Sequence, residues 1–331
     1  MKSPTTLLRR LTALSLALLI ASCGGGKKEQ PMPADFIPPS SVPAFDGARS
    51  FSLLVRQVAF GPRVPNSDAH ARCLDFYNAF FDSLDIEVEV QSFTLPGYDG
   101  EQLRLSNVIA RIHPERVDRI LLAAHWDTRP FADRETDPEA AKRPIPGAND
   151  GASGVAVLLH LAELLQSHPA PVGVDIVLFD GEDYGREGDE SMFLLGSKYF
   201  SATLDAAQRY RFGILLDLVG DRDAEFPREE LSRQFAGDVQ DMLWREARRL
   251  GLSAFTDRPH SAILDDHLPL NTVAGIKTVN IIDAALVGGT ADNPRRRYWH
   301  TLDDTPEQCS PETLDTVGRL LLSILYGIQP A

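Results

Sequence analysis

Residues 146–154 read PGANDGASG and continue directly as the apolar run VAVLLHLAELL over residues 155–165. Small residues around one acid, placed just before a periodic apolar segment, predict a tight loop that leads into a buried helix. Asp150 then lies near the N-terminus of that helix. Two interpretations are open: Asp150 only caps the helix, or it is an anchored acid that points into a functional site.

Apolar runs on both sides of this stretch predict buried strands. The run over residues 119–124 ends in His125 and Asp127. In open α/β sheets, ligands bind outside the carboxyl ends of parallel strands, which places His125 at the expected site. A satisfied structural histidine is the alternative. Asp127 is placed to orient the imidazole through its second ring nitrogen, as metal-bound histidines require.

Acids follow two further runs. Glu182 and Asp183 come just after the run over residues 174–179, and adjacent carboxylates are costly to bury unless a metal binds one and the other handles protons. A solvated acidic turn is the alternative for this pair. Asp217 stands inside the apolar run 212–219, so we expect it to bind a cation or to share a proton.

Two clusters come later in the chain. Asp265 and Asp266 precede His267, and Trp299 precedes His300 after a loop. The second pair is typical of a metal-binding histidine beside an aromatic wall, although a packing tryptophan with a surface histidine is an alternative. The charged loop 129–145 is expected to cover the mouth of the site, with three solvated acids, Asp133, Asp137 and Glu139.

The N-terminus has the features of an export signal. Arg9 and Arg10 precede the apolar residues 11–20, and this pattern predicts a signal peptide over residues 1–22. The ending IASC at residues 20–23 resembles a bacterial lipobox, in which the cysteine becomes the lipidated first residue. We therefore expect a lipid-anchored protein of the bacterial cell envelope, with a flexible tether over residues 23–44. Membrane contact is expected only through the lipidated Cys23.

Composition limits the class of protein. The 331 residues carry a formal charge of −14 without a Lys/Arg-rich stripe, which argues against nucleic-acid binding. Cys73 and Cys309 could pair or stay free, and the absence of a CxxC motif excludes a thiolate zinc site. Residues 45–331 show no second linker, so we expect one α/β domain with a mixed, mostly parallel central sheet flanked by helices on both faces.

Taken together, a set of carboxylates and imidazoles without thiolates favours zinc in a hydrolase-like site. The motifs resemble, in the same order, those of the zinc exopeptidase superfamily of co-catalytic aminopeptidases, an α/β/α sandwich. Within it the chain is most similar to the glutaminyl cyclases, especially the bacterial envelope forms. The motifs that carry the resemblance are HWD at 125–127, GANDGASG at 147–154, DGED at 180–183, LLD at 215–217, DDH at 265–267 and WHT at 299–301.

The resemblance implies two possible metal arrangements. The aminopeptidase pattern uses two zinc ions with Glu182 as general base and five ligands, namely His125, Asp150, Asp183, Asp217 and His300. The cyclase pattern uses one zinc ion on Asp150, Asp183 and His300. In that pattern Asp217 and Asp265 join Glu182 in a proton-sharing network, and Trp299 forms a wall of the glutamine pocket.

The doubled acid at 265–266 and Trp299 favour the cyclase pattern. Three departures from the animal cyclases stand out: aspartate at position 183 instead of glutamate, Asn280 where those enzymes have a histidine, and Ala124 with Val155 at the places of their disulfide. The resemblance implies that the α-amine of an N-terminal glutamine attacks its own γ-carboxamide, which yields pyroglutamate and ammonia on peptide or protein substrates. A two-zinc aminopeptidase and a non-catalytic envelope binding module are the alternatives.

Overall fold

The computed structural model describes residues 35–287 and 298–330. The predicted signal peptide and Cys23 lie outside these residues. The central sheet has six strands in the order β1-β2-β4-β3-β5-β8. The strands β4, β3, β5 and β8 run parallel, whereas β2 pairs antiparallel with both β1 and β4. The strand bounds are β1 (Glu87–Pro96), β2 (Gln102–Ile112), β3 (Arg119–His125), β4 (Gly173–Phe179), β5 (Gly213–Asp217) and β8 (Thr278–Ile282).

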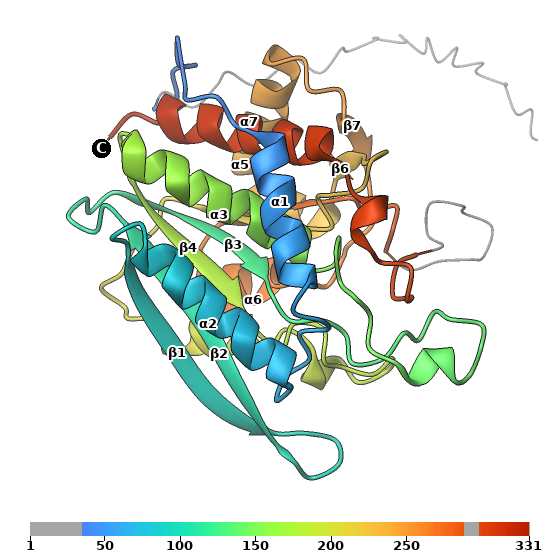
Figure 1. The fold of residues 1–331 in the computed structure, drawn as a ribbon. Helices are drawn as coiled ribbons and strands as arrows, with labels where there is room; N and C mark the ends of the chain where they lie inside the picture. Colours follow the sequence, from blue (N-terminus) through green and yellow to red (C-terminus); the bar gives the residue numbers. More distant parts are fainter. Residues whose placement is uncertain (1–34, 288–297, 331) are drawn as a thin grey trace, which may run out of the picture. The chain divides into compact units, whose positions relative to one another are not determined.

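Helices cover both faces of this sheet. Figure 1 shows α1, α3 and α7 side by side over one face, where α3 packs on β3 and β5. On the opposite face, Phe200 of α4 and Leu270 of α6 pack against alternate residues of the parallel strands, such as Leu121 and Ala123. The α-helices of the described residues are α1 (Gly47–Val58), α2 (Asp68–Asp82), α3 (Ala152–Ser167), α4 (Leu195–Thr203), α5 (Glu230–Arg249), α6 (His267–Thr272) and α7 (Pro311–Gly327).

The predicted fold class is therefore confirmed. The predicted buried runs 119–124, 174–179 and 212–219 form β3, β4 and β5, and β1 lies at one edge of the sheet. A small parallel pair, β6 (Phe226–Arg228) with β7 (Phe255–Pro259), lies outside the central sheet. No helix in the described part of the chain is long and apolar enough to cross a membrane.

The stretch that opens α3 brings this helix close to the sheet. Gly151 precedes the helix at φ +96°, a conformation that side chains with a Cβ rarely adopt. A Cβ at Gly154 would lie 2.5 Å from the carbonyl oxygen of Leu216, so only glycine allows the helix to approach β5 this closely. The N-cap residue of α3 is Gly151, and no hydrogen bond among the described residues joins the Asp150 side chain to the first turn of the helix, so the interpretation that Asp150 only caps the helix is wrong.

The described part of the predicted tether, from residue 35 onward, belongs to the same compact unit as the rest of the described chain. Phe36 is buried and forms a β-bridge with Ile328, beyond the end of α7. The Ile37 amide also donates a hydrogen bond to the Gly327 carbonyl at 2.9 Å. This contact was not predicted, because one aromatic side chain in a proline-rich stretch gives no periodic signal of packing. Cys73 and Cys309 are both buried and free.

Candidate active site

The site residues gather at the carboxyl ends of the parallel strands. His125 is the last residue of β3, and Asp217 is the last residue of β5. Glu182 and Asp183 follow β4 by a few residues, while Asp150 comes from the loop before α3. Two adjoining groups are formed by the ligand atoms of five predicted residues, namely His125, Asp150, Asp183, Asp217 and His300.

The first group consists of Asp150, Asp183 and His300, whose ligand atoms all lie within 4.8 Å of one another. His300 Nε2 lies 3.5 Å from Asp150 Oδ2 and 3.4 Å from Asp183 Oδ2. All three residues are buried, and Asp183 Oδ2 has no hydrogen-bond partner within residues 35–287 and 298–330. A buried carboxylate oxygen without a partner is costly, and a cation would satisfy it. These residues therefore fit a metal ion.

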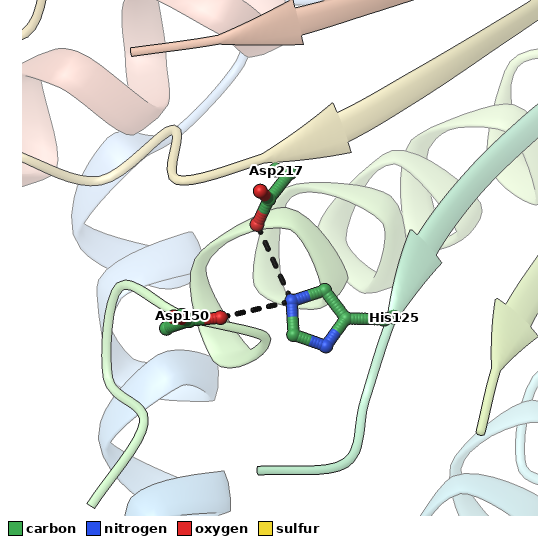
Figure 2. A group of neighbouring side chains, drawn as sticks. All are labelled: His125, Asp150 and Asp217. Atoms are coloured by element: carbon green, nitrogen blue, oxygen red, sulfur yellow. Dashed lines mark hydrogen bonds and ion pairs between the residues drawn. The ribbon is translucent and has the colours of Figure 1, made fainter. Parts of the chain in front are cut away.

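The second group consists of His125, Asp150 and Asp217. Figure 2 shows the His125 imidazole between the two carboxylates, with Nε2 at 3.1 Å from Asp150 Oδ1 and 3.3 Å from Asp217 Oδ1. Asp150 thus belongs to both groups and turns one oxygen toward each. Burial lowers the pKa of His125, but Asp127, Asp150 and Asp217 outweigh burial and hold this pKa well above its ordinary value.

Asp127 lies beside the second ring nitrogen of His125, as predicted. Nδ1 forms an ion pair with Asp127 Oδ1 at 3.5 Å, although the pair does not have hydrogen-bond geometry. The two Asp127 oxygens also accept hydrogen bonds from the backbone N–H groups of Glu182 and Asp183, at 3.0 and 3.2 Å. Asp127 therefore fixes the turn that carries the adjacent acids.

The side chain of Glu182 is the least constrained by hydrogen bonds among the described acids of the site. Its side chain makes no hydrogen bond among the described residues and is partly exposed. Loss of solvent around the carboxyl group raises the pKa of Glu182 well above its ordinary value. The positive charge of His125 opposes this rise, whereas the negative charges of Asp183 and Asp265 add to it. A carboxyl group of raised pKa without fixed partners is suited to accept and return a proton.

Asp217 and Asp265 form the acidic side of the site. Burial and the neighbouring charge of Asp265 raise the pKa of Asp217 to about 7. Burial also raises the pKa of Asp265, which accepts hydrogen bonds from the Asn280 side-chain amide and the Asp266 backbone N–H, each at 2.6 Å. Asn280 is one of the departures from the animal cyclases. Its side-chain amide contacts Asp265 of the predicted proton-sharing network, but it cannot itself take up or release a proton.

Trp299 lies beside His300, with the two rings stacked at a centroid distance of 3.6 Å. The indole is partly exposed and packs against an apolar cluster that includes Leu218 and Tyr298. The guanidinium of Arg134 lies 5.4 Å from the centre of the indole ring. Trp299 thus lies beside the histidine that the sequence predicts to bind a metal.

Two buried side chains hold the loop of Asp150, and their contacts were not predicted. Asp304 accepts hydrogen bonds from the backbone N–H groups of Asn149 and Asp150, at 2.8 and 3.1 Å. The Arg63 guanidinium donates to the carbonyls of Trp126, Pro146 and Gly147. The sequence shows that Asp304 follows His300 by four residues. It does not show which backbone N–H groups Asp304 binds, because backbone groups are the same in nearly every residue.

Fold and site together define a metallopeptidase-like α/β enzyme. The family model described as Peptidase family M28 matches residues 107–325, and the chain belongs to this family. The predicted relation to the zinc exopeptidases is thereby confirmed.

Within this family, the chain is similar to glutaminyl cyclases. It is 37% identical to the solved glutaminyl cyclase of Bacteroides thetaiotaomicron, with a TM-score of 0.81 over 86% of this chain and 99% of that one. The glutaminyl cyclase of Tannerella forsythia is 38% identical, with a TM-score of 0.80 and coverages of 86% and 99%. The glutaminyl-peptide cyclotransferase-like protein of Bos taurus is 24% identical over 80% of this chain and 71% of its own length.

Proposed function

We propose that this protein is a glutaminyl-peptide cyclotransferase that converts the N-terminal glutamine of peptides or proteins into pyroglutamate and ammonia. The observation that carries the proposal is the match to solved glutaminyl cyclases over nearly their whole length. It is supported by the gathering of Asp150, Asp183 and His300 near Glu182, whose side chain makes no hydrogen bond in the described part of the chain. No observation favours the non-catalytic binding module.

The residues that would hold the metal are Asp150, Asp183 and His300, and carboxylates with imidazole are a donor set suited to zinc. Zinc bound there would supply a Lewis acid that polarises the γ-carbonyl of the substrate glutamine. The nucleophile is the substrate's own α-amine, whose ordinary pKa of about 8 leaves enough neutral amine at mild pH.

Glu182 moves the proton in this proposal. It accepts a proton from the α-amine as the new carbon–nitrogen bond forms, and it returns that proton to the γ-amide nitrogen as the old bond breaks and ammonia leaves. Asp217 and Asp265 share a proton in this proposal, which lowers the negative charge that acts on Glu182 and keeps the proton from binding too tightly there. Trp299 forms one wall of the pocket for the glutamine side chain.

The second candidate function is a two-zinc aminopeptidase, because His125, Asp150 and Asp217 form a second group of metal-binding geometry. Zinc analysis of the purified protein, with parallel assays on a Gln-peptide and on aminoacyl anilides, separates the two functions. We expect one zinc ion per chain, cyclisation of the Gln-peptide, and at most trace anilide hydrolysis. Removal of zinc by a chelator should abolish cyclisation, and added zinc should restore it. Two zinc ions with efficient hydrolysis would contradict the proposal.

We also propose that the chain is exported and anchored to the bacterial cell envelope by a lipid on Cys23. The support is the sequence of residues 1–23 alone, since this segment lies outside the described residues. A Cys23→Ser variant is expected to move from the membrane fraction to the soluble fraction of the producing bacterium. If both forms fractionate alike, the lipid anchor is wrong, whereas the proposed enzymatic activity is unaffected.

A further inference from the structure

A buried guanidinium links two acids at the edge of the candidate active site. Arg129 Nη1 donates a hydrogen bond to Asp183 Oδ1 at 2.6 Å. On its other side, Arg129 Nε and Nη2 donate to the two oxygens of Asp133 at 3.0 and 2.5 Å. The Arg129 side chain is 2% exposed, so its planar fork is held in one orientation between these carboxylates.

Arg129 and Asp133 each contact one of the proposed metal-binding residues. In both cases the contact uses an atom of that residue that points away from the other proposed ligands. Asp183 uses Oδ1 for Arg129, which leaves the unpartnered Oδ2 facing His300 Nε2. His300 places Nδ1 at 3.3 Å from Asp133 Oδ1. Asp183, Arg129, Asp133 and His300 therefore close a ring around one side of the group.

The loop that carries Arg129 and Asp133 also holds the backbone of His300. The Arg134 amide donates to the His300 carbonyl at 3.2 Å, and Glu135 accepts from the Leu302 amide at 2.9 Å. His300 has φ +56°, a left-handed conformation that residues with a Cβ adopt at a cost. The expectation that Asp133 is simply solvated is thus wrong: its side chain is 27% exposed and is paired on both sides.

We propose that Arg129 and Asp133 are positioning residues for the metal-binding group. Arg129 occupies one oxygen of Asp183 and reserves the other as a single ligand atom, while Asp133 holds the ring of His300 with Nε2 directed inward. This inference deepens the proposed function and rests on it for the identity of the metal. The alternative is that Arg129 only competes with the metal through its positive charge. In that case the geometry of its hydrogen bonds would have no effect on zinc affinity.

The test measures zinc binding to the metal-free protein by competition with a chromogenic chelator. Arg129→Lys keeps the charge and removes the fork, and Asp133→Ala removes the contact to His300. Both variants should bind zinc about 10- to 100-fold more weakly, the usual cost of losing an outer partner of a metal ligand. The matched control is Asp137→Ala, which removes an exposed acid from the same loop and should bind zinc like the unchanged protein.

The visible absorption of the cobalt-substituted protein reports the coordination of the metal and does not depend on the stability of the fold. In Arg129→Lys, the freed Asp183 oxygen can join the coordination, so the visible absorption of the cobalt form should change, whereas in Asp137→Ala it should stay the same. Equal melting temperatures of the metal-free variants would show that the fold is retained. Zinc affinities within twofold of the control, or an unchanged cobalt spectrum, would overturn the inference. Neither measurement uses a peptide substrate, so both are independent of whether the protein cyclises glutamine.

Discussion

Replacing Glu182 by glutamine is expected to lower kcat for cyclisation of a Gln-peptide about a thousandfold, with little change in zinc binding. The reason is that a positioned acid–base group contributes roughly 10²- to 10⁴-fold to proton transfer, and the amide of glutamine cannot take up the amine proton. Glu182 belongs to neither metal-binding group, so the metal ligands remain intact. The measurement is steady-state kinetics together with zinc analysis of the same preparations.

The matched control is Glu187→Gln, which removes an exposed acid from the segment after the same turn. It should retain the kcat of the unchanged protein, because its side chain lies outside both metal-binding groups. A Glu182→Gln variant that keeps kcat within tenfold would remove Glu182 from the proposed mechanism. Another carboxylate, such as Asp265, would then have to carry the proton.

The elements that present these residues could be predicted because their signals are local. Uninterrupted apolar runs indicate parallel strands, and the carboxyl ends of such strands meet at one edge of a sheet. The sequence alone therefore places His125, Glu182 and Asp217 together at one edge of the sheet. The small residues around Asp150 likewise predict a tight entry into a helix, which Gly151 and Gly154 make possible.

The contacts that hold the site could not be predicted in the same way. Asp304 and Asp127 bind backbone N–H groups, and every residue except proline offers such a group, so the sequence does not indicate the partner. Asp133 stands in a charged, proline-containing loop, a composition typical of solvated segments. Its pairing with Arg129 depends on where that loop lies against the segment of His300, which is a property of the tertiary structure.

Alanine substitutions of the buried histidines His300 and His125 are expected to have very different effects on zinc binding. His300→Ala should weaken zinc binding by more than the roughly 100-fold that the loss of an outer partner costs, because it removes one of three proposed ligands. Cyclisation should fall to the background rate. His125→Ala should still bind one zinc ion per chain, since His125 does not belong to the group of Asp150, Asp183 and His300. The measurements are zinc affinity by chelator competition and steady-state kinetics for each variant.

This pair of variants also distinguishes one metal ion from two, because Asp150 is the only residue that the two groups share. In a one-zinc enzyme, His125 and Asp217 remain an ion pair beside the metal, and removal of the imidazole leaves the zinc content unchanged. In a two-zinc enzyme, the same substitution lowers the zinc content from two ions to one and abolishes hydrolysis. A loss of zinc from His125→Ala as large as that from His300→Ala would therefore favour the aminopeptidase. Retention of one zinc ion in His125→Ala, with its loss in His300→Ala, would assign the metal to the group that adjoins Glu182.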